Sequence, residues 1–375
     1  MEFEKYRLSQ LLTIKNGRDY KSLGQGSVPV FGSGGYMCSV DSYLYDRPSV
    51  LLPRKGTLSN IQYYDKGPFW TVDTCYYTIV DKNLVNSYYI YRYLRNLNLS
   101  GLDTGASIPS MTQKTYNGIK ILLPNLSIQH RIASILSTYD SLIENNTKRI
   151  SLLEKMAENL YKEWFVRFRF PGHENVEMEN GLPKGWKMTN LFDVADVTYG
   201  FAFKSNKFCD NAELNPVVRI RDIQENHTNT YTDEQCEDKY LIGKNAILIG
   251  MDGIFHMCLW NGERAYMNQR VVMLNSKEKG VCNYLLYLAI RPQIKYWEQV
   301  ISGTTVAHLG DKHLRKVKVL LPEKAILEKA NSIISRAMDE KNILQHQNSL
   351  LARQRDLLLP RLMSGKLEVK EELLE

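Results

Sequence analysis

The chain has 375 residues, 43% of them hydrophobic and 24% charged, an ordinary composition for a globular protein long enough to form two cores. Its 48 basic and 41 acidic residues give a net charge of +7, a mild indication of a polyanionic partner. The sequence has no run of about 18 apolar residues, and its first residues are charged, which argues against a membrane span and a signal peptide. We expect a cytoplasmic protein that contacts no membrane.

The first region, residues 1–124, is expected to be a globular domain of short strands and a helix. Two apolar runs are typical of buried strands, a glycine turn follows the first run, and a tyrosine-rich segment predicts a short helix. A glycine loop then leads to the final strand. In chain order these segments are Val50–Pro53, Arg54–Thr57, Cys75–Val80, Tyr88–Leu94 and Thr104–Ser107.

A long helix is predicted over residues 125–170. Its apolar residues recur in alternating steps of four and three, which is the seam of a coiled coil, and Asn146 interrupts this seam. Ser127, just after Pro124, is the predicted N-cap. The predicted seam residues are Ile128, Ile132, Ile135, Tyr139, Leu142, Ile150, Leu153, Ala157, Leu160 and Trp164.

Residues 171–184 are rich in Pro, Gly and Glu and are expected to form a surface linker. The second domain, residues 185–322, then repeats the order of the first. The matching segments are Ala246–Ile249, Gly250–Gly253, Arg270–Leu274, Tyr284–Leu288 and Ser302–Thr305. We expect both domains to be α/β, or α+β, with irregular strands.

A second long helix is predicted over residues 323–360, followed by a charged tail over 361–375. Pro360 and Gly365 are expected to end this helix, and the polar Gln347 lies inside its seam. The predicted seam residues are Ile326, Ala330, Ile333, Ala337, Leu344, Leu351 and Leu358.

The chain therefore contains one domain-plus-helix unit twice. Leu122-Leu123-Pro124 recurs as Leu320-Leu321-Pro322, an offset of 320 − 122 = 198 residues, and Gly105 matches Gly303. Neither helix can bury a narrow seam alone, so we expect an antiparallel coiled coil between two similar domains, with a pseudo-two-fold internal duplication. Asn146 and Gln347 either fix the register of this pair or face solvent or a partner.

Motifs of catalysis are missing from the sequence. The tetrapeptide of an amino-methyltransferase is absent, Asn215-Pro216-Val217-Val218 being the nearest approach, and there is no P-loop. The six cysteines lack CxxC spacing, and His227, His256, His308 and His313 lack ligand spacing. We expect neither catalysis nor a bound metal in this chain.

Three segments resemble the specificity subunit of type I restriction–modification systems. Leu182-Pro183-Lys184-Gly185-Trp186 is similar to that family's entry to its second recognition domain, and Leu359–Leu367 to its C-terminal signature. Gln129-His130-Arg131-Ile132 is similar to its entry to the central helix, whereas Ile326-Leu327-Glu328-Lys329 lacks the glutamine.

This resemblance implies that each domain reads one half of a split, asymmetric site on double-stranded DNA, and that the helices set the spacing. It implies docking of two modification (methyltransferase) subunits and further restriction (translocase/nuclease) subunits. No cofactor would bind this chain, and S-adenosylmethionine, ATP and Mg would belong to the partner subunits.

The candidate DNA contacts are polar loop or strand-edge residues near the repeated glycine turns, where phosphate contacts supply affinity and base-edge contacts supply specificity. In the first domain they are Lys15, Arg18, Lys21, Arg54, Lys55, Ser59, Asn60 and Gln113. In the second domain they are Lys204, Lys207, Arg219, Arg221, Asp252, His256, Gln269 and His308.

Three alternatives stay open. The chain could be a coiled-coil scaffold that joins proteins without binding DNA. It could be the recognition part of a single-chain enzyme, although 375 residues leave no room for a fused methyltransferase. It could also be an inactive or phase-variable relative within the family.

Overall fold

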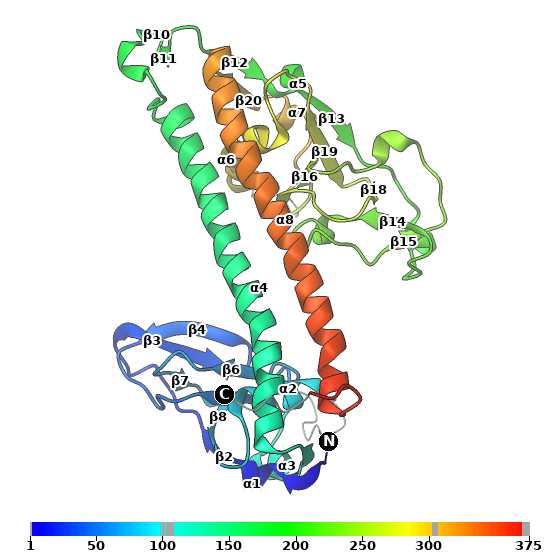
Figure 1. The fold of residues 1–375 in the computed structure, drawn as a ribbon. Coiled ribbons are helices and arrows are strands. Elements are labelled where there is room, and N and C mark those ends of the chain that lie inside the picture. The colour runs from blue at the N-terminus through cyan, green and yellow to red at the C-terminus, as the bar shows by residue number, and fades with distance from the viewer. Residues whose placement is uncertain (1, 98, 100–101, 103–108, 302–306, 370–375) are drawn as a thin grey trace. The chain divides into compact units, whose positions relative to one another are not determined.

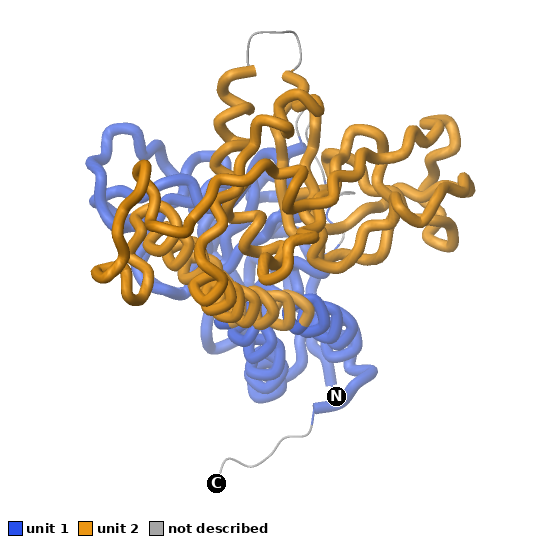
Figure 2. Tube along the Cα trace, turned by 90° about the horizontal axis from the view of Figure 1, so that it is seen from above, with its two compact units in different colours: residues 1–145, 347–375 blue, residues 146–346 orange. Residues whose placement is uncertain are grey.

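The computed structural model describes residues 2–97, 99, 102, 109–301 and 307–369 (Figure 1). The chain forms two compact units, residues 1–145 with 347–375 and residues 146–346 (Figure 2). Each unit contains one mixed domain and one half of each long helix, α4 (Leu126–Tyr161) and α8 (Lys324–Met363). No helix of the described residues is long and apolar enough to cross a membrane.

The domain of the first unit is built on two sheets and a short antiparallel ladder. One sheet has the order β2-β8-β5-β6, the other β4-β3-β7, and β1 pairs with β9. The strands are β1 (Glu4–Arg7), β2 (Leu12–Asn16), β3 (Gln25–Gly32), β4 (Gly35–Val40), β5 (Ser49–Pro53), β6 (Gln62–Tyr64), β7 (Trp70–Thr71), β8 (Cys75–Val80) and β9 (Lys120–Leu123). The helices are α1 (Leu8–Leu11), α2 (Ser87–Asn96) and α3 (Gln113–Asn117).

The domain of the second unit repeats this topology. Its sheets have the orders β13-β19-β16-β17 and β15-β14-β18, and β12 pairs with β20. The strands are β12 (Lys187–Asn190), β13 (Ala195–Tyr199), β14 (Asn215–Val218), β15 (Tyr231–Thr232), β16 (Ile247–Gly250), β17 (Met257–Leu259), β18 (Tyr266–Met267), β19 (Val271–Ser276) and β20 (Lys318–Leu321). The helices are α5 (Leu191–Val194), α6 (Asn283–Val300) and α7 (Asp311–Leu314).

The likeness between the domains extends to details of the backbone. β3 and β7 pair in parallel, and so do β14 and β18. A glycine follows the corresponding strand in each domain, and its backbone passes so close to the other sheet that no side chain fits. A Cβ on Gly17 would lie 2.0 Å from the Val72 carbonyl oxygen, and one on Gly200 would lie 1.9 Å from the Asn268 oxygen. The predicted duplication is therefore confirmed in the fold.

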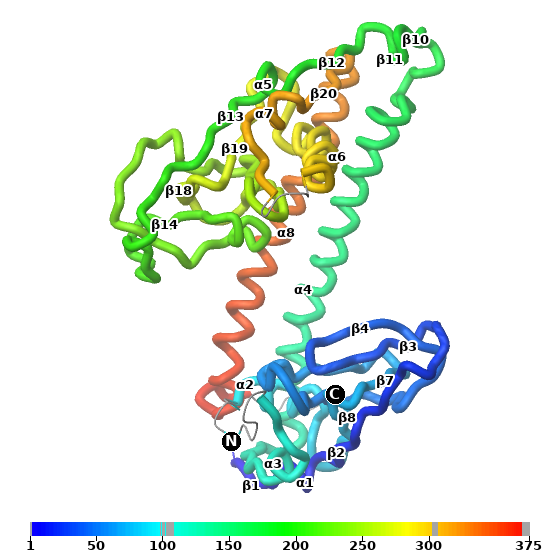
Figure 3. Tube along the Cα trace, turned by 180° about the vertical axis from the view of Figure 1, so that it is seen from behind, coloured from blue at the N-terminus to red at the C-terminus, as the bar shows by residue number. Residues whose placement is uncertain are grey.

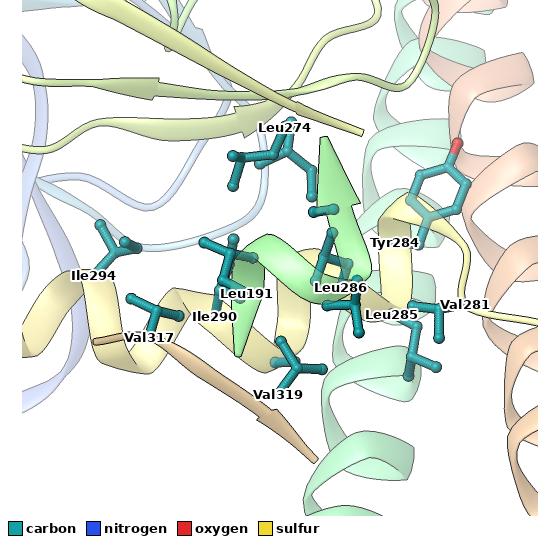
Figure 4. Packing of buried hydrophobic residues seen from close by; sticks show 14 of the residues in the cluster. Leu191, Leu274, Val281, Tyr284, Leu285, Leu286, Ile290, Ile294, Val317 and Val319 are labelled. Carbon is teal, nitrogen blue, oxygen red and sulfur yellow. The ribbon is translucent and has the colours of Figure 1, made fainter. Parts of the chain in front are cut away.

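The predicted strands and helices are buried as the apolar pattern requires. Every residue of β5 and of β16 is buried. In the second unit, Leu286, Ile290 and Ile294 of α6 pack toward Leu274 of β19 and Val319 of β20 (Figure 4). α6 is much longer than the predicted Tyr284–Leu288, because its apolar face continues to Ile294. The predicted glycine loops Thr104–Ser107 and Ser302–Thr305 lie outside the described residues.

Within each unit, α4 and α8 lie side by side and antiparallel (Figure 3). In the first unit, Asp140 forms an ion pair with Arg355, and the late α8 residues Leu359 and Leu362 share a core with Ile132 of α4. In the second unit, Lys341 binds Glu154. Later residues of α4 thus meet earlier residues of α8, and the antiparallel prediction is confirmed.

Several details of the predicted seam are wrong. Ile135 and Leu142 are exposed, and Leu136 is fully buried in place of the former, because Leu136 packs with Ile132 in the core of the first unit. Asn146 is buried, but Gln347 is exposed. The next residue, Asn348, faces the pair, and its amide donates to the Ile143 carbonyl.

The helix ends also differ from their predictions. The side chain of Asn125, not Ser127, accepts a hydrogen bond from the Ile128 N–H at 2.9 Å and caps α4. Pro360 does not end α8, which runs on to Met363. A proline so close to a helix end removes one hydrogen bond only, and burial of Leu362 and Met363 in the core of the first unit holds this last turn in place.

The segment 171–184 contains a small hairpin, β10 (Met178–Glu179) with β11 (Leu182–Pro183). The motif that follows has direct structural roles. Lys184 binds Glu177 at 2.8 Å, Gly185 adopts a left-handed backbone with φ of 83°, and Trp186 is buried. The Trp186 ring packs on Phe165, Phe168 and Phe170, which come directly after α4. The motif therefore joins the long helix to the second domain.

Candidate nucleic-acid interface

Backbone hydrogen bonds hold the glycine turn after β5, and three of them recur in the second domain. The N–H of Arg54 donates to Thr74 at 2.8 Å, that of Met111 to Arg54 at 3.0 Å, and that of Gly56 to Pro109 at 2.9 Å. These bonds tie the turn to the start of β8 and to the segment before α3. We call the three tied segments the recognition frame of the first domain, residues 54–56, 73–74 and 109–111.

The second domain builds the same frame from the same three bonds. The N–H of Met251 donates to Arg270 at 3.0 Å, that of Leu309 to Met251 at 2.7 Å, and that of Gly253 to Ala307 at 2.9 Å. Its recognition frame consists of residues 251–253, 269–270 and 307–309. An isolated bridge also recurs, between Lys55 and Ser110 in the first domain and between Asp252 and His308 in the second.

The first frame presents cationic and amide side chains. Lys55 is exposed and Arg54 half-buried, with an Arg54 Nη1 contact of 3.4 Å to the Asp73 carbonyl. Beside the frame, the Gln113 amide donates to Asn16 Oδ1 at 3.0 Å and the Asn60 amide to the Ser33 carbonyl at 2.6 Å. The surface therefore offers positive charge and amide groups, which suit phosphates and base edges.

The second frame presents a different set of groups. Asp252 Oδ1 lies 2.6 Å from His308 Nδ1, and its Oδ2 lies 3.3 Å from Arg270 Nε. Where Gln113 meets Asn16 in the first domain, Asp311 meets Tyr199 in the second, and the Tyr199 hydroxyl donates at 2.8 Å. One backbone frame thus carries an amide pair in one domain and a phenol–carboxylate pair in the other.

Charge and burial tune this phenol–carboxylate pair. Burial and the hydrogen bond to Asp311 raise the pKa of Tyr199, so it stays a neutral donor. Hydrogen bonds from Arg315 and Tyr199 lower the pKa of Asp311, which is therefore ionised at neutral pH. The Arg315 guanidinium also lies 4.5 Å from the centre of the Phe192 ring.

Comparison with models of protein families shows which family the chain belongs to. The model of the type I restriction modification DNA specificity domain matches residues 1–155 and 183–351. The chain belongs to this family. The two matched regions contain the two recognition frames.

Individual specificity subunits resemble this member along much of its length. The type I restriction enzyme MjaIX specificity subunit of Methanocaldococcus jannaschii is 25% identical, covering 88% of this chain and 79% of its own. The EcoBI specificity subunit of Escherichia coli is 28% identical over 53% of this chain and 43% of its own. The S subunit of M. genitalium shares the fold, with a TM-score of 0.68 at 16% identity, covering 96% of each chain.

The other predicted contacts of the first domain lie at the end of β2, on the loop that follows it and after the glycine turn. Lys15 is exposed at the end of β2, next to Asn16, and Arg18 and Lys21 are exposed on the loop that follows. The Arg18 carbonyl accepts from Trp70 Nε1 at 2.8 Å, which fixes the backbone while leaving the guanidinium outside. Ser59 is exposed after the glycine turn. A DNA contact by any of these residues remains a prediction.

The predicted contacts of the second domain divide into two groups. Asp252, His256, Gln269 and His308 lie in or next to the recognition frame. The other four lie on the loops around β14 and β15, where acidic groups bind several of them. Lys207 pairs with Asp233, Arg219 pairs with Asp222, the Lys204 N–H donates to Glu234, and Arg221 is exposed. A DNA contact by any of these four residues remains a prediction.

Sequence reasoning missed Arg270, Tyr199, Asp311 and Asn16. One feature of the sequence could have identified these residues: a glycine follows β2 in the first domain, and another follows β13 in the second. Gly17 and Gly200 are 200 − 17 = 183 residues apart, whereas the later repeat has an offset of 198. An insertion in the second domain hides this match from a single-offset comparison. An alignment of the two glycines matches Asn16 with Tyr199 in the sequence. This match would have shown that the two residues occupy equivalent positions in the two domains.

Other chemistry is limited in the part of the chain that the structure describes. It has no group of three or more His, Cys, Asp and Glu side chains arranged to hold a metal ion. Its cysteines are free, and burial raises the pKa of Cys75 and of Cys258 to about 12, so neither is a reactive thiolate at neutral pH.

Proposed function

We propose that this chain is the non-catalytic DNA-recognition subunit of a type I restriction–modification complex, and that each domain reads one half of a split, asymmetric site. The observation that carries this proposal is the recognition frame, which occurs twice with the same backbone bonds and different side chains. A repeated backbone gives both domains the same approach to the duplex. The different side chains allow each domain to recognise a different DNA sequence.

The asymmetry of the proposed target follows from the paired positions. Asn16 and Gln113 offer amide donors and acceptors, whereas Tyr199 and Asp311 offer a hydroxyl and a carboxylate. Groups of such different hydrogen-bonding character select different base edges in the major groove. The two half-sites are therefore expected to differ, and the whole site is not palindromic.

The long helices are proposed to set the distance between the half-sites and to dock two modification subunits. Those subunits would bind S-adenosylmethionine and turn an adenine out of the duplex for methylation. Restriction subunits that use ATP and Mg would complete the complex. The proposal assigns none of these reactions to the present chain, whose part is to bind and orient the duplex.

Mapping N6-methyladenine tests this function. The full chain is expressed with a cognate modification subunit, and a matched culture lacks the chain. We expect methylation at one split sequence, two short specified segments around an unspecified spacer, only in the culture that contains the chain. Co-purification of the subunits without chain-dependent methylation would favour a scaffold or an inactive relative instead.

A further inference from the structure

Asp252 stands out because it is an acid in a surface proposed to bind a polyanion. The matching position of the first frame carries Lys55. A carboxylate repels a phosphate, so Asp252 is not suited to a backbone contact with DNA. Its side chain is 28% exposed, so a ligand can reach it. An acid kept in such a place suits a hydrogen-bond donor on a base edge.

The two neighbours of Asp252 hold its carboxylate in one orientation. His308 binds Oδ1 and Arg270 binds Oδ2 through Nε. Each carboxylate oxygen has two acceptor sites, so each keeps capacity for a further donor. Among the described residues, Arg270 forms its ion pair with Asp252 through Nε. The Arg270 side chain is 54% exposed. The flat end of the guanidinium, Nη1 and Nη2, is thus available as a fork.

This arrangement matches one base pair better than the others. In the major groove, guanine displays two acceptors, O6 and N7, which fit the fork of an arginine. The cytosine paired with it displays an amino donor, N4, which fits a carboxylate. An A·T pair offers no base with two adjacent acceptors to such a fork. The Arg270–Asp252 pair therefore presents donors and acceptor in the combination that a G·C pair requires.

We propose that Arg270 and Asp252 together read one G·C base pair in the half-site of the second domain. Arg270 donates to guanine O6 and N7, Asp252 accepts from cytosine N4, and His308 is a positioning residue that fixes the carboxylate. This inference rests on the proposed function and adds to it the identity of one base pair.

The test compares methylation maps for the wild-type chain and its variants Arg270→Ala, Arg270→Lys and Asp252→Asn, each in the full complex. We expect the wild-type second half-site to contain a specified G·C pair. Arg270→Ala should reduce discrimination at that pair by about tenfold or more, with the first half-site unchanged. Arg270→Lys keeps the charge but loses the fork, so it should relax the same position, which a phosphate contact would not do.

Arg264→Ala is the matched control, since Arg264 is an exposed arginine of the same domain outside the recognition frame. Its map should equal that of the wild type. If the wild-type complex gives a split sequence and the Arg270 variants leave it unchanged, the base-pair assignment is wrong while the proposed function stands. If the wild-type complex gives no split sequence, the proposed function itself fails. Circular dichroism of each variant identifies loss by misfolding, and Asp252→Asn then provides an independent test of the same position.

Discussion

Replacing Asp140 by alanine is expected to lower the free energy of unfolding of the first unit by about 3 kcal/mol. Asp140 lies on α4 and binds Arg92 of α2, Tyr88 of α2 and Arg355 of α8. The Arg92 side chain is 3% exposed. Without the carboxylate, two guanidinium groups would lie close together in a poorly hydrated place, and this uncompensated charge is the source of the loss.

This effect is measured by unfolding the full chain in urea and monitoring the unfolding through hydrogen exchange in α2. Glu144→Ala is the matched control, because Glu144 lies one turn further along α4 and pairs with Lys66 at an exposed site. Such a surface pair contributes about 1 kcal/mol or less. Equal losses from the two variants would show that the Asp140 cluster is no more than a surface ion pair.

The same carboxylate makes the first unit sensitive to acid. Burial alone would raise the pKa of Asp140, but hydrogen bonds from Tyr88 and Arg355 and the charge of Arg92 outweigh it and lower the pKa. Because the folded state binds the proton less tightly than the unfolded state, the contribution is complete above about pH 4 and is lost as the pH falls through the folded pKa. The Asp140→Ala variant should lack this part of the acid response.

Trp186→Ala is expected to destabilise the second unit by about 3–5 kcal/mol. Trp186 is 7% exposed, and its ring centre lies 4.9 Å from that of Phe170 and 5.8 Å from that of Phe165. Alanine would leave a cavity among aromatic rings that are fixed by α4 and by the start of the second domain, so the site cannot collapse to fill it.

Hydrogen exchange over residues 163–186 in increasing urea measures this loss directly. Tyr296→Ala is the control, since Tyr296 is a large aromatic residue of the same unit with 57% exposure. It should change stability by no more than about 0.5 kcal/mol. A Trp186→Ala chain with unchanged protection would mean that the motif serves a partner rather than the packing of its own chain.

Most of the fold could be predicted from the sequence because local patterns agree with it. The apolar runs that became β5 and β16 are fully buried, and the repeated final strands form matching ladders with β1 and β12. The details of the helix pair could not be predicted, because which face of α4 is buried depends on contacts with residues far along the chain. Leu136 and Ile135 are neighbours of similar hydrophobicity, and only packing decides between them.

The candidate site could be predicted only in part, because local sequence patterns mark some of its residues and not others. Arg54, Lys55, Asp252 and His308 were found because glycine turns mark their loops in the sequence. Arg270 was missed because it lies at the start of a strand, and its proximity to Asp252 arises from a backbone bond between β19 and the turn. Lys207 was chosen for its charge, but its partner Asp233 lies 26 residues away in the sequence.

The most direct test of the account is a methylation map for Arg54→Ala in the full complex. Arg54 belongs to the first recognition frame. We expect one half of the split sequence to become relaxed or weakened, while the half assigned to the second domain keeps every specified base. A uniform loss of methylation across unrelated sequences would reduce Arg54 to a phosphate contact. A change in both halves at once would contradict the central claim that each domain reads its own half-site.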